Sequence, residues 1–137
     1  MSRVTDKHKA DDEDAGQLKF GSSFSDDVTQ QNMLTISEVK LLLESLKADQ
    51  VPDNAIFNKT REYVETFARF NEAETVDTVR KSLPNPEFAW YEMVQLVNLC
   101  PMEAEEAKAL IPSLTKMDDD TLQQHLDELS IARKQQQ

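Results

Sequence analysis

The sequence predicts an all-α fold, a helical bundle with one short strand near its N-terminus. After residue 35, apolar residues recur with the three-to-four-residue spacing of amphipathic helices. Prolines and capping residues divide this stretch into short helices, and the 137 residues contain only two glycines. Before it, Gln17–Phe20 alternates polar and apolar residues as a strand does. A chain of this length forms about one domain with a single core.

The N-terminal part of the chain is expected to divide into two segments. Residues 1–15 form an acidic and polar tail that buries nothing and should be disordered in isolation. Residues 16–34 hold the strand, with Leu18 and Phe20 on one side, and a connection to the helices. No later segment offers a partner strand, and an unpaired strand is unstable alone. Two interpretations stay open: a coil that rests both side chains on the helices, or a strand added to another protein's sheet.

The helical domain is expected over residues 35–134, and three helices precede Pro84. They span about residues 35–48, 54–70 and 71–83. Thr35 and Glu38 form a capping box for the first helix, and Asn71 caps the third. Helical spacing places the following residues on the inward faces: Ile36, Val39, Leu42, Leu43, Leu46, Ile56, Tyr63, Val64, Phe67, Phe70, Val76, Val79 and Leu83.

The fourth helix, about residues 86–99, is expected to begin with Asn85 as its cap and Pro86 in its first turn. It is apolar on most sides, so neighbours must cover it all round. Trp90 and Met93 are the candidates for surplus apolar surface. Either both belong to the core, or they face a partner.

The segment after the fourth helix has two prolines that fix where a short fifth helix begins and ends. Pro101 lacks a backbone N–H and biases Cys100 away from helical geometry, and Pro112 stops the helix. The fifth helix begins with acids, which suit a helix N-terminus. They are Glu103, Glu105 and Glu106. Its Leu110 is expected to be buried, so a charge there should disrupt folding and assembly together.

The last helix is expected to begin with Asp118, Asp119 and Asp120. It carries one inward stripe of leucines, Leu122, Leu126 and Leu129. Residues 135–137 should fray.

The composition argues against an enzyme and against a self-sufficient nucleic-acid binder. The net charge of −11 disfavours nucleic acid and anionic membranes, and no apolar run approaches the roughly 20 residues of a spanning helix. Cys100 is the only cysteine, which suits a reducing compartment, and it lacks a credible histidine partner. No glycine-rich phosphate loop can be built, and the three consecutive aspartates lack the spacing of a calcium loop. No catalytic residue, cofactor or metal site is therefore predicted.

Several segments, in order, resemble the fourth-largest subunit of eukaryotic RNA polymerase II. The most specific is residues 98–114, NLCPMEAEEAKALIPSL, in which a Leu-Cys-Pro turn leads into an acidic helix and Ile-Pro-Ser-Leu. Residues 17–20, QLKF, with Phe24 following, resemble the family's N-terminal segment. Residues 66–70, TFARF, and 122–127, LQQHLD, also fit. The resemblance covers roughly residues 14–134 and is of the fungal kind, without a long charged insertion.

The resemblance implies a non-catalytic subunit with a helical fold of the helicase-and-RNase-D C-terminal type. It implies an N-terminal strand that pairs with the seventh-largest subunit, forming with it a stalk near the RNA exit channel. That stalk supports transcription initiation and couples to messenger RNA processing, export and decay. The expected partners are the seventh-largest subunit and the polymerase core, with nascent RNA reached only through the partner and no membrane. The expected location is the nucleus, with shuttling to the cytoplasm.

The residues expected at the partner interface are Leu18, Phe20, Phe24, Trp90, Met93, Cys100, Pro101 and Leu110. Two alternatives remain open: the corresponding stalk subunit of RNA polymerase III, and a free-standing helical adaptor.

Overall fold

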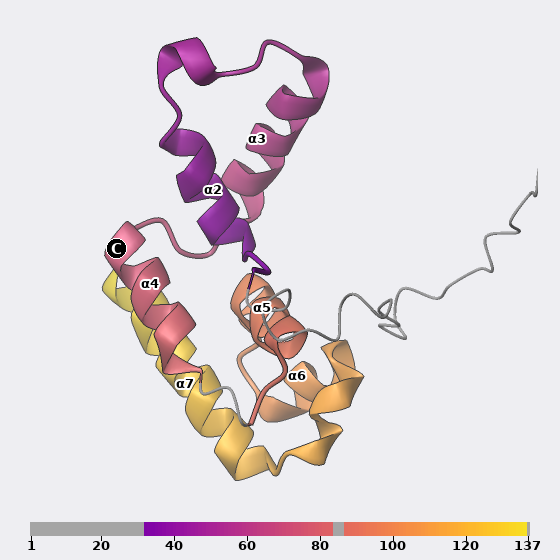
Figure 1. Ribbon diagram of the computed structural model, residues 1–137. Coiled ribbons are helices and arrows are strands. Elements are labelled where there is room, and N and C mark those ends of the chain that lie inside the picture. Colours follow the sequence, from indigo (N-terminus) through magenta and orange to yellow (C-terminus); the bar gives the residue numbers. More distant parts are fainter. Residues whose placement is uncertain (1–31, 84–86, 137) are drawn as a thin grey trace, which may run out of the picture. The chain divides into compact units, whose positions relative to one another are not determined.

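The computed structural model describes residues 32–83 and 87–136, and within these ranges the fold is all-α, as predicted (Figure 1). The described residues form the α-helices α2 (Ile36–Glu44), α3 (Ala55–Phe67), α4 (Ala73–Ser82), α5 (Trp90–Leu99), α6 (Ala104–Leu110) and α7 (Asp119–Gln135). They also form two 3₁₀ helices, η3 (Ala48–Gln50) and η4 (Pro112–Lys116). The expected tail over residues 1–15 and the strand near residue 18 lie outside the described residues, so both stay predictions.

The core is built mainly by α4 to α7. The leucine stripe of α7 is buried, as predicted, because α6 and α4 both pack against that helix. Figure 1 shows α4 lying along α7. Between α6 and α7, Ile111 and Leu114 are fully buried, and η4 folds back onto α6. Burial of these side chains, at roughly 25 cal/mol per Å² of apolar surface, is what holds the short helices together.

Helices α2 and α3 pack mainly against each other. Several long-range hydrogen bonds join this pair to the remainder of the described chain, and two of them involve backbone N–H groups. The Ser37 hydroxyl accepts from the Phe70 N–H at 3.1 Å, and the Asn98 side chain accepts from the Ile36 N–H at 2.9 Å. Ser37 is buried, so its oxygen satisfies a backbone donor that would otherwise be stranded.

Three helix boundaries differ from the prediction. Helix α2 keeps its Thr35 capping box but ends at Glu44, several residues before the expected end. Asn71 does not cap α4; its side chain instead accepts from the Lys40 ammonium at 2.8 Å. Helix α5 begins at Trp90, with extended backbone at Ala89 before it. The expected cap at residues 85 and 86 lies outside the described residues.

The predicted inward faces of the first two helices are only partly correct. Leu42 in α2 is exposed, and so are Ile56, Tyr63 and Phe67 in α3. Helix α3 is covered chiefly from one side, by α2, so Val64 is its only buried residue. Periodicity correctly grouped residues on a face but could not show which face meets a neighbour.

The end of the chain is better ordered than predicted. Helix α7 continues to Gln135, and the Gln136 side chain donates to the Arg69 carbonyl at 2.6 Å. The same side chain accepts from the Asn71 N–H at 2.9 Å. Fraying is therefore not seen at Gln135 and Gln136, because these bonds fasten the end of α7 to the loop between α3 and α4.

Candidate partner interface

The structure separates the expected interface residues into buried and exposed groups. Leu18, Phe20 and Phe24 lie outside the described residues. Met93 and Cys100 are buried, with 2% and 8% of their surface exposed, and Pro101 is also buried. Trp90 is half-buried, and Leu110 is 49% exposed. The expectation that Leu110 is buried was wrong: Ala104 and Ala107 are the buried residues of α6.

Trp90 and Arg80 form a small cluster where α4, α5 and the start of α2 meet. The Arg80 guanidinium lies over the indole ring, 5.5 Å from its centroid, which is within cation–π range. Arg80 also donates to the Glu38 carboxylate at 2.9 Å and to the Met33 carbonyl at 3.0 Å. Trp90 also packs against the buried core while staying only half-buried, so the structure places it at the edge of the core.

Cys100 ends helix α5, as its following proline predicted, but its backbone is left-handed and not the extended conformation that a proline favours in the residue before it. Cys100 is left-handed, with φ 45° and ψ 54°, and its N–H still donates to the Leu96 carbonyl at 2.8 Å. A left-handed residue is a common helix terminus, although glycine usually occupies it. The thiol donates to the Val97 carbonyl at 3.2 Å. Burial raises the pKa of the Cys100 thiol, and the positive charges of Arg133 and Arg69 offset only part of that rise.

Glu92 is a fully buried carboxylate that sequence reasoning missed. It accepts from the Ala89 N–H at 2.8 Å, the Ser113 hydroxyl at 2.7 Å and the Lys116 ammonium at 2.7 Å. Burial alone would raise the pKa of Glu92, but these three hydrogen bonds together hold it below its ordinary value. Glu92 thereby joins the first turn of α5 to η4. A glutamate in the third position of a helix was the available signal, since such a residue often caps its own helix.

Helix α3 carries the most exposed apolar surface that the sequence had assigned to the core. Ile56, Tyr63 and Phe67 are 81%, 55% and 48% exposed. Their spacing of seven and four residues places them on one face of the helix, and the rings of Tyr63 and Phe67 contact each other with centroids 4.7 Å apart. We call these three residues the α3 stripe.

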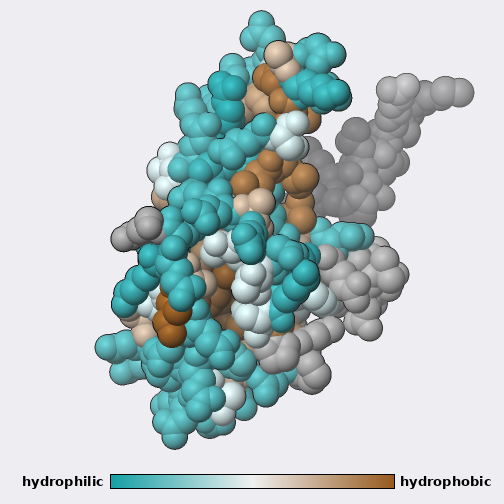
Figure 2. Space-filling model, turned by 90° about the vertical axis from the view of Figure 1, so that its left-hand side faces the viewer, coloured by the Kyte–Doolittle hydropathy of each residue, from teal (hydrophilic) through white to brown (hydrophobic). Residues whose placement is uncertain are grey.

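A second apolar surface lies between α2 and α4. Leu34, Leu41, Leu42 and Val76 line an open groove of about 310 Å³. Figure 2 shows a largely hydrophilic face on which hydrophobic side chains gather in its upper half, at the height of α2 and α3 in Figure 1. Leu34, one of the residues that line this groove, belongs to the first few described residues.

The described residues offer little for catalysis. His125 contacts the Glu87 carboxylate at 2.9 Å and packs edge-on against Phe88. Within residues 32–83 and 87–136, no cluster of three metal-ligating side chains occurs. In the same ranges, no helix has both the length and the apolar character needed to cross a bilayer.

Comparison with known proteins assigns the chain a family. Residues 33–133 match the family model described as RNA polymerase Rpb4. The chain is 43% identical to DNA-directed RNA polymerase II subunit rpb4 of Schizosaccharomyces pombe over 131 residues, which cover 90% of this chain and 93% of that protein.

Two more distant relatives carry related names. The identity is 37% with DNA-directed RNA polymerase II subunit rpb4 of Dictyostelium discoideum, covering 90% of this chain and 91% of the relative. It is 31% with DNA-directed RNA polymerase II subunit 4 of Arabidopsis thaliana, covering 90% and 96%.

Proposed function

This chain belongs to the RNA polymerase Rpb4 family as a non-catalytic subunit of RNA polymerase II, and we propose that it works by pairing with the seventh-largest subunit. The pair forms a stalk near the RNA exit channel, supports initiation and couples to later messenger RNA processing, export and decay. The chain is nuclear, and we propose that it also shuttles to the cytoplasm. The exposed α3 stripe is the main structural observation that supports the proposed pairing.

The α3 stripe has the composition of an interface rather than of an ordinary surface. Single apolar residues are normal on a protein surface, but here three large ones share one helix face, and two of them, Tyr63 and Phe67, are in contact. The row from Ile56 to Phe67 extends about 16 Å along the helix, at about 1.5 Å per residue. Tyrosine is among the residues that contribute most to binding energy at interfaces, and a neighbouring aromatic ring adds rigid apolar area. A partner with an apolar face would remove this row from water.

The N-terminal strand would supply a second attachment. Leu18 and Phe20 lie on one side of the alternating segment, with Lys19 on the other. A strand added to the edge of the partner's sheet would place both apolar side chains against that partner, and Phe24 would follow them. The groove that begins at Leu34 adjoins this segment in the sequence, so an interface could continue from strand to helices.

RNA is expected to contact the partner rather than this chain. The net charge of −11 repels phosphate, and the two basic residues at the end of α4 are engaged: Arg80 with Glu38, and Lys81 with Asp77 at 2.7 Å. The names of the relatives favour polymerase II over polymerase III and over a free-standing adaptor.

The test is co-expression of the full chain with the seventh-largest subunit, followed by a pull-down and a measured dissociation constant. Changing Tyr63 and Phe67 together to Glu should weaken the complex at least about 100-fold, because two exposed aromatic anchors are replaced by charges. Ile131→Glu on α7 is the matched control, since Ile131 is 54% exposed and outside the stripe.

A second variant addresses the strand. Changing Leu18 and Phe20 to Asp should weaken the same complex, because it would bury charge against an apolar site. Pairing that survives both double variants unchanged would refute the proposed mode of assembly. Circular dichroism of each variant checks that the helices still form.

A further inference from the structure

The edge of α7 and the turn after α5 enclose a groove that is separate from the α3 stripe, although Cys100 and Pro101 in its lining are also among the residues expected at the partner interface. It has a volume of about 220 Å³ and is lined by Cys100, Pro101, Met102, Leu126, Leu129, Ser130, Arg133 and Lys134. At about 30 Å³ per molecule, the space corresponds to about seven waters. None of these residues belongs to α2 or α3.

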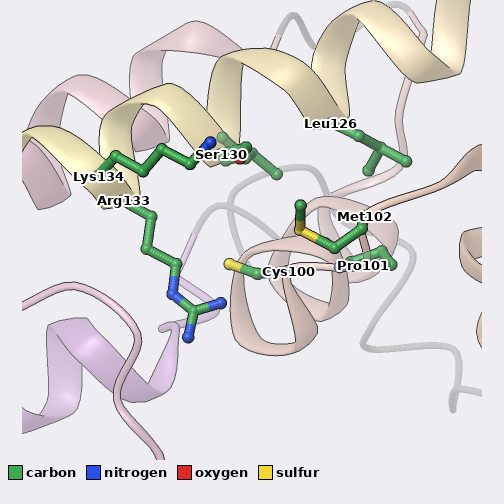
Figure 3. Close-up of a pocket in the computed structure, with 8 residues that line it drawn as sticks. Cys100, Pro101, Met102, Leu126, Ser130, Arg133 and Lys134 are labelled. Atoms are coloured by element: carbon green, nitrogen blue, oxygen red, sulfur yellow. The ribbon is translucent and has the colours of Figure 1, made fainter.

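The floor of the groove is apolar and its rim is exposed. Leu126 and Leu129 are 1% and 2% exposed, so the floor is part of the core. Met102 at the rim is 57% exposed, which is unusual for a large apolar side chain beside a hollow. Figure 3 shows Cys100, Pro101 and Met102 on one side, facing the α7 side chains across the opening. Because both leucines are almost fully buried, an apolar side chain placed there would pack mainly on Met102.

The charge of the groove is opposite to that of the chain. The chain has 26 acidic and 15 basic residues, yet the described groove lining contains two bases and no acid. Figure 3 shows Arg133 reaching from α7 toward Cys100. Arg69, from the loop after α3, also acts electrostatically on Cys100, and it donates to the Asn98 carbonyl at 3.5 Å. Within the described ranges, no carboxylate forms a salt bridge with Arg133 or Lys134.

We propose that this groove docks a short acidic peptide of a protein partner, which places one apolar side chain on Met102, above the buried Leu126 and Leu129, and one carboxylate against Arg133. Arg69 and Lys134 add positive charge beside that carboxylate. A planar guanidinium suits a carboxylate because it can donate two parallel hydrogen bonds. The exposed Met102 favours a peptide over a nucleic acid, because a peptide can place an apolar side chain on it and a charged phosphate backbone cannot.

The test measures the fluorescence anisotropy of a labelled probe peptide, Glu-Asp-Leu-Phe-Asp-Glu, as the full chain is added. We expect saturable binding that weakens as salt is raised. Arg133→Glu should weaken it at least about tenfold, while Arg133→Lys, which keeps the charge, should cost less. Ser130→Trp should block binding by filling the groove. Lys59→Glu on α3 is the matched charge-reversal control and should leave binding unchanged.

Three results would overturn the proposal. The first is equal binding of a peptide with Ser in place of Leu-Phe, and the second is tighter binding of an oligouridine than of the probe. The third is probe binding that appears only after Asp11, Asp12, Glu13 and Asp14 are changed to Ala, which would assign the groove to the chain's own N-terminal segment. Unchanged helicity by circular dichroism keeps loss of binding from being mistaken for loss of fold.

Discussion

Replacing Glu92 with Ala should lower the free energy of unfolding by about 3 kcal/mol, because three hydrogen bonds end on its buried carboxylate. Two donors, the Ala89 N–H and the Ser113 hydroxyl, would lose their partner in a partly buried setting. The third, the Lys116 ammonium, is on a side chain that is 52% exposed, so water can replace the carboxylate. Because water replaces this third partner, the expected loss of stability is smaller than the sum for three hydrogen bonds to a charged group.

Glu92→Gln should cost less, about 1 kcal/mol, because the amide keeps the shape and one acceptor while losing the ion pair. Urea unfolding of the full chain, followed by circular dichroism and by the fluorescence of its single tryptophan, Trp90, measures both changes. Glu105→Ala on the exposed side of α6 is the control and should change stability by less than about 0.5 kcal/mol. An Ala variant at position 92 as stable as the parent would refute the view that this carboxylate joins α5 to η4.

Three further outcomes follow from the same contacts. Folding lowers the pKa of Glu92, so the stability that this carboxylate contributes is fully present above its ordinary pKa of 4.5. That stability is lost as the pH falls through the lower pKa of the folded state. Glu92→Gln should therefore make the free energy of unfolding less dependent on pH in the acid range. Cys100→Val should destabilise the chain by about 1 kcal/mol more than Cys100→Ala in urea unfolding, because a branched side chain fits left-handed backbone poorly; equal stabilities would contradict this. Leu110→Asp should leave the thermal melting temperature nearly unchanged, because this side chain is half exposed. Unfolding of the variant at room temperature would contradict the exposed position of Leu110.

The parts of the fold that could be predicted are those decided by neighbouring residues. Thr35 and Glu38 cap each other in α2, and Asp118 caps α7 by accepting from the Thr121 N–H at 2.8 Å. Pro101 ends helix α5 by a local effect that does not depend on the path of the following chain. The leucine stripe of α7 repeats often enough to define one face, and the structure buries that face.

The parts that could not be predicted depend on contacts distant in sequence. Ser37 and Phe70 are 33 residues apart, and nothing local marks the serine as a buried acceptor. Which face of α3 is buried depends on which helix packs against it, and the spacing of apolar residues does not specify that. The interface residues illustrate the same limit, because Met93 and Leu110 are both apolar positions on short helices, yet one is buried and the other exposed.

The groove at the edge of α7 was also beyond sequence reasoning. Cys100 and Arg133 come together only because α7 packs back against the turn after α5. Sequence reasoning predicted that the turn itself is an interface element, from its prolines and its resemblance to the polymerase subunit, and that stays a prediction. It gave no sign that the basic end of α7 would lie beside it.

The most direct test of the account is purification of the tagged full chain from its own cells, followed by mass-spectrometric identification of what accompanies it. The account predicts the catalytic subunits of RNA polymerase II together with the seventh-largest subunit, and loss of the latter contact when Tyr63 and Phe67 are changed to Glu. Recovery of RNA polymerase III subunits instead, or of no polymerase at all, would contradict it.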